Sequence, residues 1–375
     1  MKSEWAKVPI ESICQGIYDG PHATPAPSDN GAIFLGISNF VNGRLNFSDI
    51  RYIAEEDLPK WTKRVTPQAH DIVFSYEATL NLYAIIPEGF RGCLGRRMAL
   101  MRPDESKVDY RYLYYYMYSP AWRAEIEAHK VMGSTVDRIP LIYFPSFTIE
   151  LPSMTIQRRI ADILSALDDK IELNQRINEN LQQQIFSLFH AEYQYPKDNE
   201  GWQNGCIGDV VNLQRGYDLP KDKVIDGGYP VAGSTDTIAY HANFTTEPPC
   251  IVMGRSGNIG RPRLYLQKCW AHNTTLFSKE YKNSDPYWVY AMLSSIDYGQ
   301  FQGGSAVPTL NRNHVHAFPI DIPPRTKQKE FGEFASALFG VITQNTEENK
   351  KLGLIRDTLL PKLMSGEIDV SGIQL

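Results

Sequence analysis

The sequence predicts an α+β protein built from two tandem copies of one unit, each a globular α/β part followed by a long helix. Three observations predict this class. The chain has 375 residues, which is long for a single domain. A segment recurs along it at a constant shift of 171 residues, and both copies of that segment end in a heptad pattern of apolar positions. With 42% hydrophobic and 22% charged residues, the composition is that of an ordinary globular protein.

The repeat is clearest where residues 133–188 are aligned with residues 304–359. This alignment needs no gap and gives 16 identities in 56 positions. Weaker similarities at shifts between 171 and 199 flank it, and they pair residues 5–13 with 202–210, 18–21 with 217–220, and 112–117 with 287–292. The two copies therefore share an architecture and differ by insertions and deletions.

Both copies end in a helical seam with the 4,3 spacing of a coiled coil. In the first copy it runs from Ile160 to Leu188, and in the second from Phe331 to Leu359. Each seam carries two asparagines at the same places, Asn174 and Asn178 in the first and Asn345 and Asn349 in the second.

A buried asparagine at such a position needs a polar partner and therefore fixes the register of a helix pair. Antiparallel pairing about a pseudo-twofold axis predicts Asn174 opposite Asn349, and Asn178 opposite Asn345. The simpler alternative is that two surface helices carry these asparagines without pairing. One departure from symmetry is Arg356, which stands where the first seam has Ile185.

The parts that precede the helices have the pattern of mixed α/β domains. Short apolar runs at residues 71–75, 82–86 and 250–253 are bounded by turn residues, as strands are, and residues 110–128 and 287–295 are expected to be helical. The predicted division is a first recognition domain at 1–151, a central helical region at 152–195, a second recognition domain at 196–322 and a distal helical region at 323–375.

The motifs of enzymes and metal sites are not matched. The glycine-rich stretch at residues 254–263 lacks a phosphate-binding lysine and is expected to be a turn between strands. Residues 284–287 resemble a methyltransferase DPPY signature but lack one proline. His314 and His316 have strand spacing, and Cys269 with His272 lacks a second ligand pair, so each is expected to be structural. We therefore predict no catalytic residue, no metal site and no cofactor on this chain.

The net charge of −5 hides two basic segments. Residues 150–200 carry 5 basic and 9 acidic side chains, whereas residues 251–282 have a net charge of +5 and residues 84–103 of +3. A phosphate backbone responds to such local charge over about 8–10 Å. The candidate DNA contacts are Arg91, Arg96, Arg97, Arg255, Arg261 and Arg263, with Tyr217, Asn273 and Thr274 beside them. The alternative for any one arginine is that it pairs with a carboxylate such as Glu88.

Several strings, in the same order in both copies, carry a family resemblance. They are Asp71-Ile-Val-Phe-Ser-Tyr-Glu-Ala-Thr79, the run from Cys93 to Asp104, Ser256-Gly-Asn-Ile-Gly260, Ala271-His-Asn-Thr-Thr-Leu276, the Pro-x-x-x-x-Gln helix starts at Pro152 and Pro323, and Leu359-Leu-Pro-Lys-Leu-Met-Ser-Gly-Glu-Ile368. Together they resemble the specificity subunit of type I restriction-modification enzymes.

That resemblance implies that each globular part is a target-recognition domain reading one half of a bipartite site on double-stranded DNA. It also implies that the paired helices space the two domains and dock two modification subunits, with a restriction subunit joining the full complex. S-adenosylmethionine, ATP and Mg²⁺ are then expected on the partner subunits and none on this chain.

Two other function classes remain open at this stage. One is a self-sufficient methyltransferase or nuclease, and the other is a coiled-coil adaptor that does not contact DNA. The N-terminus has no apolar run of a signal peptide, no segment reaches the length of a membrane-spanning helix, and the five cysteines are unpaired in sequence, so a cytoplasmic protein is expected.

Overall fold

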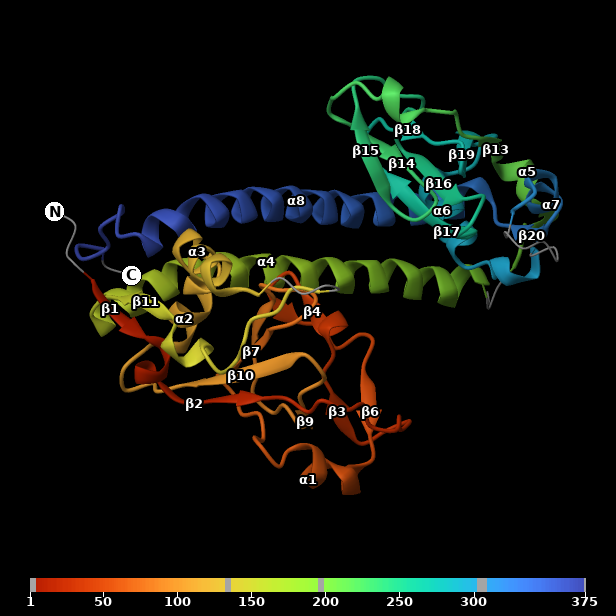
Figure 1. The fold of residues 1–375 in the computed structure, drawn as a ribbon. Coiled ribbons are helices and arrows are strands. Elements are labelled where there is room, and N and C mark those ends of the chain that lie inside the picture. Colours follow the sequence, from red (N-terminus) through yellow and green to blue (C-terminus); the bar gives the residue numbers. More distant parts are fainter. Residues whose placement is uncertain (1–4, 132–135, 195–198, 302–308, 374–375) are drawn as a thin grey trace. The chain divides into compact units, whose positions relative to one another are not determined.

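The computed structural model describes residues 5–131, 136–194, 199–301 and 309–373 (Figure 1). The chain forms two compact units, one of Met1–Glu172 with Asn349–Leu375 and one of Leu173–Glu348. Each unit combines one globular part with portions of both long helices. Residues 133–135 and 304–308, where the sequence repeat begins, and the predicted boundary at 195/196 lie outside the described residues. The four predicted segments stay a sequence-based division.

The first unit is built around a four-stranded antiparallel sheet in the order β2-β10-β7-β8. Its strands are β2 (Cys14–Asp19), β10 (Met98–Pro103), β7 (Ile72–Ser75) and β8 (Tyr83–Ile85). The remaining strands form the sheet β6-β3-β9 from Arg51–Ile53, Ala32–Phe34 and Gly92–Cys93, the ladder β1-β11 from Ala6–Pro9 and Thr148–Leu151, and the hairpin β4-β5 from Phe40–Val41 and Arg44–Leu45. Its short helices are α1 (Leu58–Trp61), α2 (Tyr110–Tyr116) and α3 (Pro120–His129).

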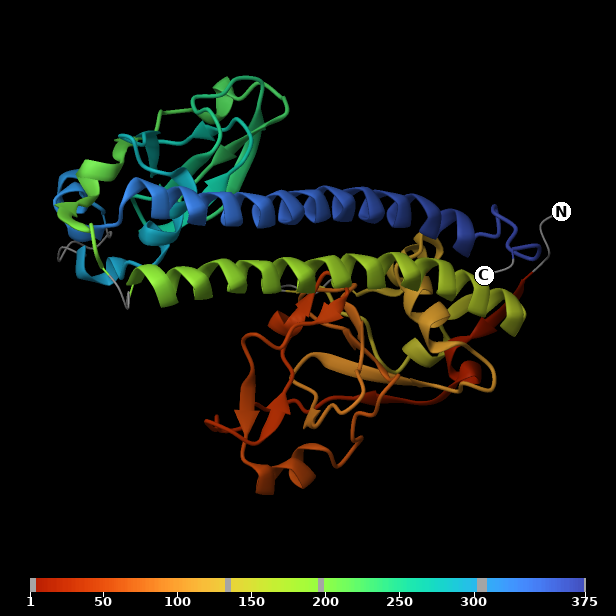
Figure 2. The same cartoon turned by 180° about the vertical axis from the view of Figure 1, so that it is seen from behind.

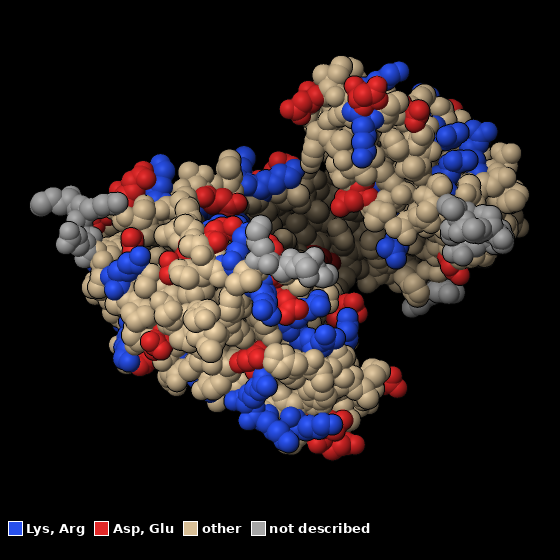
Figure 3. Space-filling view, in the orientation of Figure 1, with Lys and Arg blue, Asp and Glu red and all other residues tan. Residues whose placement is uncertain are grey.

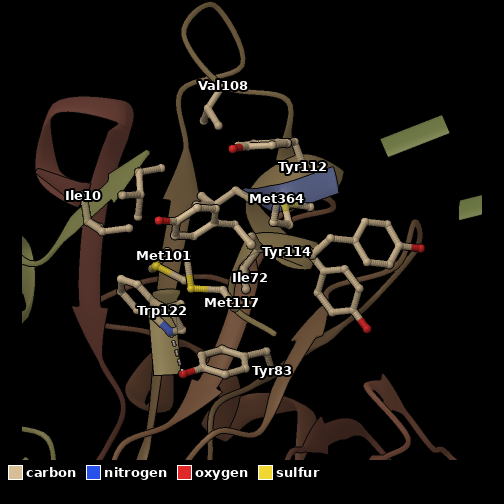
Figure 4. Packing of buried hydrophobic residues seen from close by; sticks show 14 of the residues in the cluster. Ile10, Ile72, Tyr83, Met101, Val108, Tyr112, Tyr114, Met117, Trp122 and Met364 are labelled. Carbon is tan, nitrogen blue, oxygen red and sulfur yellow. Dashed lines mark hydrogen bonds between the residues drawn. The ribbon is translucent and has the colours of Figure 1, made fainter. Parts of the chain in front are cut away.

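Both faces of this sheet are buried, which explains why its strands read as continuous apolar runs. Alternate residues of a strand point to opposite faces. Phe74 and Met101 therefore pack on the helical side, and Val73 and Leu100 pack on the other. On the helical side Trp122 donates its indole N–H to the hydroxyl of Tyr83 at 2.9 Å, as the close view of this core shows (Figure 4).

The second unit repeats the same sheet in the order β13-β19-β16-β17. Its strands are β13 (Asn212–Arg215), β19 (Thr275–Glu280), β16 (Cys250–Gly254) and β17 (Gly260–Tyr265). The other elements are the sheet β15-β14-β18 from Thr237–His241, Tyr229–Ala232 and Trp270–Ala271, the ladder β12-β20 from Gln203–Cys206 and Pro319–Ile322, and the helices α5 (Ile207–Val210), α6 (Pro286–Ser294) and α7 (Arg312–His316). The α+β class and its tandem units are confirmed.

The sheet registers correct two of the weaker sequence alignments. The N–H of Gly20 bonds Met98 O, and that of Gly216 bonds Thr275 O, so Gly20 corresponds to Gly216 and the predicted pairing of residues 18–21 with 217–220 is wrong by three positions. The capping residues Asp109 and Asp285 likewise align at a shift of 176 rather than the 175 of the sequence match. In both cases identical side chains at nearby positions favoured a sequence alignment that differs from the one given by the hydrogen bonds.

The helix expected over residues 110–128 is in fact two helices. Helix α2 ends at Tyr116, and α3 begins after Ser119, whose side chain accepts the N–H of Trp122. Pro120 occupies the first turn of α3, where its missing N–H costs nothing, and it prevents α2 from continuing. The pair His314 and His316 is also helical, in α7, rather than on a strand.

The Pro-x-x-x-x-Gln motif at each long-helix start has a structural role that repeats in both units. Gln157 is 1% exposed; its amide oxygen accepts the backbone N–H of Asp109, and its amide nitrogen donates to Pro152 O. Gln328 makes the same bonds to Asp285 and Pro323. One amide thus joins the capping residue of α2 or α6 to the first turn of the long helix.

We expect the Gln157→Ala variant to be less stable by about 2–3 kcal/mol, because it leaves a buried N–H and a buried carbonyl without partners. The measurement is urea denaturation followed by circular dichroism. Gln175→Ala removes the same amide from an exposed position of the same helix and is expected to change stability by less than about 0.5 kcal/mol. Equal urea midpoints for the two variants would show that the buried amide does not stabilise the fold.

The two long helices run antiparallel to each other within each unit (Figures 1 and 2). They are α4 (Met154–Phe189) and α8 (Arg325–Met364). In the first unit Asp168 binds Arg356, and Ile171 O, three residues further along α4, accepts a hydrogen bond from Asn349, seven residues earlier on α8. Residue numbers therefore rise along one helix as they fall along the other. No described helix is long and apolar enough to cross a membrane.

The helix pair also explains the departure from symmetry at Arg356. Its guanidinium donates to Asp168 at 2.7 Å, and Asp168 also accepts the hydroxyl of Tyr115 at 2.8 Å. In the second unit the repeat places Phe339 and Ile185 at the corresponding positions, both inside one buried apolar cluster. An ion pair in the first unit thus stands where the second unit has a hydrophobic pair, and the two units differ at both positions.

Candidate nucleic-acid interface

In the first unit, two loops meet at one end of the four-stranded sheet. They are residues 76–82, which join β7 to β8, and residues 94–97, which lead into β10. The N–H of Tyr76 bonds Arg97 O at 3.1 Å, and the N–H of Ile139 bonds Tyr76 O at 2.7 Å. Arg97 has φ = +65°, a left-handed conformation that turns the chain sharply at this end.

The three arginine candidates of the first unit differ in what they contact. Arg91 pairs with Glu55, and Arg97 pairs with Glu77 at 3.1 Å. Arg96 is exposed, and no described residue makes an ion pair or a hydrogen bond with its guanidinium. Of these three side chains, Arg96 is therefore the one whose donors are available to a ligand.

The second unit presents the corresponding loop between β16 and β17. Its glycine-rich sequence forms a hairpin turn with Gly257 at φ = +82°, as predicted for a turn between strands. The N–H of Arg255 bonds Thr274 O, and the N–H of Leu310 bonds Arg255 O, both at 2.8 Å. This is the hydrogen-bond pattern of Tyr76 in the first unit, so the two loops occupy the same place in the repeated sheet.

The remaining candidates of the second unit divide in the same way. The guanidinium groups of Arg255 and Arg261 have no charged partner among the described residues, and Arg261 is exposed. Arg263 instead donates to Gly233 O, lies 3.8 Å from a carboxylate oxygen of Asp236 and packs over the ring of Tyr265, so its contacts are structural.

The polar candidates beside this loop are already hydrogen-bonded. Asn273 donates its amide to Asp218, and the hydroxyl of Thr274 lies 3.1 Å from Nδ1 of His272. Tyr217 is 39% exposed, and its hydroxyl accepts a hydrogen bond from Gln214 at 3.0 Å. Of the three, Tyr217 offers the most accessible surface to a ligand.

The coiled-coil asparagines are partly brought together. Asn345 donates its amide to Asn178 Oδ1 at 2.9 Å within the second unit. Asn174 is 1% exposed and donates to Glu348, while Asn349 donates to Ile171 O in the first unit. The pairing of Asn174 with Asn349 spans the two units and stays a prediction.

Sequence reasoning missed one basic feature of the first unit. A cavity of about 500 Å³ is lined by Lys60, Lys63 and Arg64, close to the loop that carries Arg96. The signal was hidden because Glu55, Glu56 and Asp57 precede these residues and lower the net charge of the segment. Figure 3 shows lysine and arginine side chains, with carboxylates beside them, over the end of the first unit that carries α1.

His316 is partly buried and has a structural role. Its Nε2 accepts the N–H of Leu213 at 2.9 Å, and burial together with the charges of Arg312 and Lys282 lowers its pKa below the usual 6.5. Across the described residues, no group of three or more histidine, cysteine, aspartate or glutamate side chains could hold a metal ion.

The lowered pKa of His316 predicts a loss of stability in mild acid. Below pH 6.5 the unfolded chain takes up a proton that the folded chain resists, so stability is constant above pH 6.5 and falls toward the lowered pKa. We expect the melting temperature to drop more between pH 7.5 and 5.5 in the wild type than in His316→Gln. His314→Gln changes an exposed neighbour in the same helix and is expected to follow the wild type; the opposite order would contradict the assignment.

Comparisons with known proteins agree with this arrangement. The family model for the type I restriction modification DNA specificity domain matches residues 2–183 and again residues 199–353. The chain is 24% identical over 360 residues to the MjaIX specificity subunit of a type I restriction enzyme from Methanocaldococcus jannaschii, covering 85% of this chain and 82% of that protein. It is 23% identical over 286 residues to a putative type I specificity subunit from Mycoplasma genitalium, covering 69% and 72%.

The fold has a solved counterpart. The crystal structure of the S subunit of a type I restriction-modification system from M. genitalium superimposes with a TM-score of 0.61 and 18% identity, covering 96% of each chain. The family model matches both halves of the chain, each of which has its own copy of the four-stranded sheet. The chain therefore belongs to the family of type I restriction-modification DNA specificity subunits, and it is a non-catalytic subunit of such a system.

Proposed function

We propose that this subunit reads a bipartite DNA target, with one half-site for each unit. The observation that carries the proposal is the repeated loop at one end of the sheet, which has an arginine free of carboxylate partners in or beside it in both units: Arg96 in the first, and Arg255 with Arg261 in the second. Arginine forms bidentate bonds to guanine edges and equally to phosphates. Arg91, Arg97 and Arg263 then support the loops rather than read bases.

We further propose that the long helices dock two modification subunits. Large apolar side chains on them are exposed, with Leu354 at 70% and Ile355 at 47% in the first unit, and Leu173 at 52% and Val341 at 41% in the second. Exposed apolar residues on a helix favour a protein partner over water. S-adenosylmethionine, ATP and Mg²⁺ are then held by the partner subunits, and the complex acts on DNA in the cytoplasm.

The decisive experiment is methylome sequencing of a host that expresses this chain together with its neighbouring modification subunit. We expect a split motif, with a fixed unspecified spacer, that is methylated only when this chain is present. An active modification subunit that methylates the same sites with and without this chain would reject the function. Methylation with no sequence preference would favour the coiled-coil adaptor instead.

A further inference from the structure

The basic cavity in the first unit is adjacent to the loop of residues 94–97, which carries Arg96 and is proposed to read bases. Leu94 lines it, two residues before Arg96, and so does Gly20. The N–H of Gly20 bonds Met98 O at 2.9 Å, and a side chain at Gly20 would collide with the backbone oxygens of Met98 and Gly95. The cavity wall is therefore held in fixed contact with the segment that carries Arg96.

More basic than acidic side chains line this cavity, and two of the basic ones have no ion-pair partner among the described residues. Asp19 alone of the lining residues is acidic, and it is already bound by Arg64 at 3.1 Å and by His22 at 2.9 Å. Lys60 and Lys63 are exposed, and among the described residues neither forms an ion pair. The cavity thus presents two ammonium groups whose attraction no carboxylate of its lining offsets.

Trp61 lies between the two lysines in sequence and also lines the cavity. The ammonium of Lys60 lies 5.6 Å from the centroid of its ring. An oxygen-rich anion is the ligand that two unpaired ammonium groups on the wall of one cavity would bind.

We propose that this cavity, through Lys60 and Lys63, binds a backbone phosphate of the DNA whose bases the Arg96 loop reads. The inference rests on the proposed function. Phosphate contacts set the position of a protein on the duplex, and base contacts specify the sequence. A phosphate anchor joined to the reading loop through Gly20 and Leu94 would fix the depth at which that loop enters its groove.

The matching place in the second unit has a different neighbour. Gly216 occupies the position of Gly20, and the next residue is Tyr217, whose ring lies 6.5 Å from that of Trp270. The proposed anchor is assigned to the first unit alone, and its loss should weaken binding without changing the bases preferred at either half-site.

The test uses the full chain bound to its modification subunit and two duplexes, one with the methylated motif and one with that motif scrambled. Affinity is measured by fluorescence anisotropy from 50 to 300 mM KCl. For the Lys60→Ala/Lys63→Ala variant we expect at least about a fivefold loss of affinity near 100 mM salt, equal on both duplexes, and a salt slope smaller by about 1, since one phosphate contact contributes about 0.9.

Two controls separate a specific contact from a general change of charge. Lys60→Arg/Lys63→Arg keeps both charges and is expected to keep the slope, and Lys7→Ala removes one exposed charge from β1 and is expected to change nothing. Melting temperatures of all variants establish that each is folded.

An unchanged slope in the double alanine variant, a loss confined to the motif duplex, or an equal loss per charge in Lys7→Ala would each overturn the anchor. In those cases a wild-type complex that still prefers the motif leaves the proposed function standing. A wild-type complex that binds neither duplex overturns both.

Discussion

Replacing Arg356 by isoleucine is expected to destabilise the first unit by about 2–3 kcal/mol, because it removes the cation from a carboxylate that is largely shielded from water. The side chain of Asp168 is 12% exposed and, of the donors in the described part of the chain, would keep the hydroxyl of Tyr115 alone. The measurement is urea denaturation, and the midpoint of the first unit is expected to fall.

A second substitution, copied from the second unit, is expected to restore the stability that this variant loses. Asp168→Phe combined with Arg356→Ile reproduces the pair Phe339 and Ile185, which the second unit buries in its own core. Because the double variant buries no uncompensated charge, it is expected to recover most of the lost stability. Arg158→Ala, at an exposed position of α4, controls for the loss of an arginine. A single variant as stable as the wild type would show that the ion pair contributes nothing.

Lengthening both long helices by one heptad is expected to change the DNA spacer. Seven residues after Glu172 and seven after Glu348 preserve the seam and add about 10 Å to each helix, which matches about 3 base pairs of duplex. If the helices set the distance between half-sites, methylation at the original spacing falls by more than about 100-fold, since one half-site is then lost.

The readout is methylation of a plasmid library in which both half-sites are constant and the spacer varies over one helical turn. A library of this range identifies the preferred spacer whatever combination of rise and twist the lengthened subunit favours. Insertion of four residues in one helix alone breaks the seam and serves as the control for lost pairing. An unchanged preferred spacer in the heptad variant would refute the helices as the element that sets the spacing.

The fold was largely predictable from the sequence because its strongest signals are periodic. The 171-residue repeat and the heptad seam identified the tandem units and the long helices, and the strands expected at 71–75 and 250–253 are found as β7 and β16. The ends of the elements were less predictable. The break at Pro120 and the alignments at Gly20 and Asp285 depend on helix caps and on hydrogen bonds between strands, which a local sequence pattern does not reveal.

The candidate site was predictable only as a set of segments. Sequence indicated which stretches are basic, but a guanidinium paired with Glu55 or Glu77 looks the same in sequence as a free one. The cavity lined by Lys60 and Lys63 was missed because the charge of the segment also counts Glu55, Glu56 and Asp57, which precede the lysines in the chain and do not line the cavity. Partner geometry, rather than composition, separates a contact that holds a loop from one available to DNA.

The division of the chain into units has a consequence for the order of events during synthesis. The second unit is continuous, from Leu173 to Glu348, whereas the core of the first unit needs Leu360, Leu363 and Met364 from the far end of α8. Domains fold as units while the ribosome is still extending the chain. The unit whose residues are translated first is therefore the one completed last, and until the end of α8 emerges its core lacks the side chains of Leu360, Leu363 and Met364.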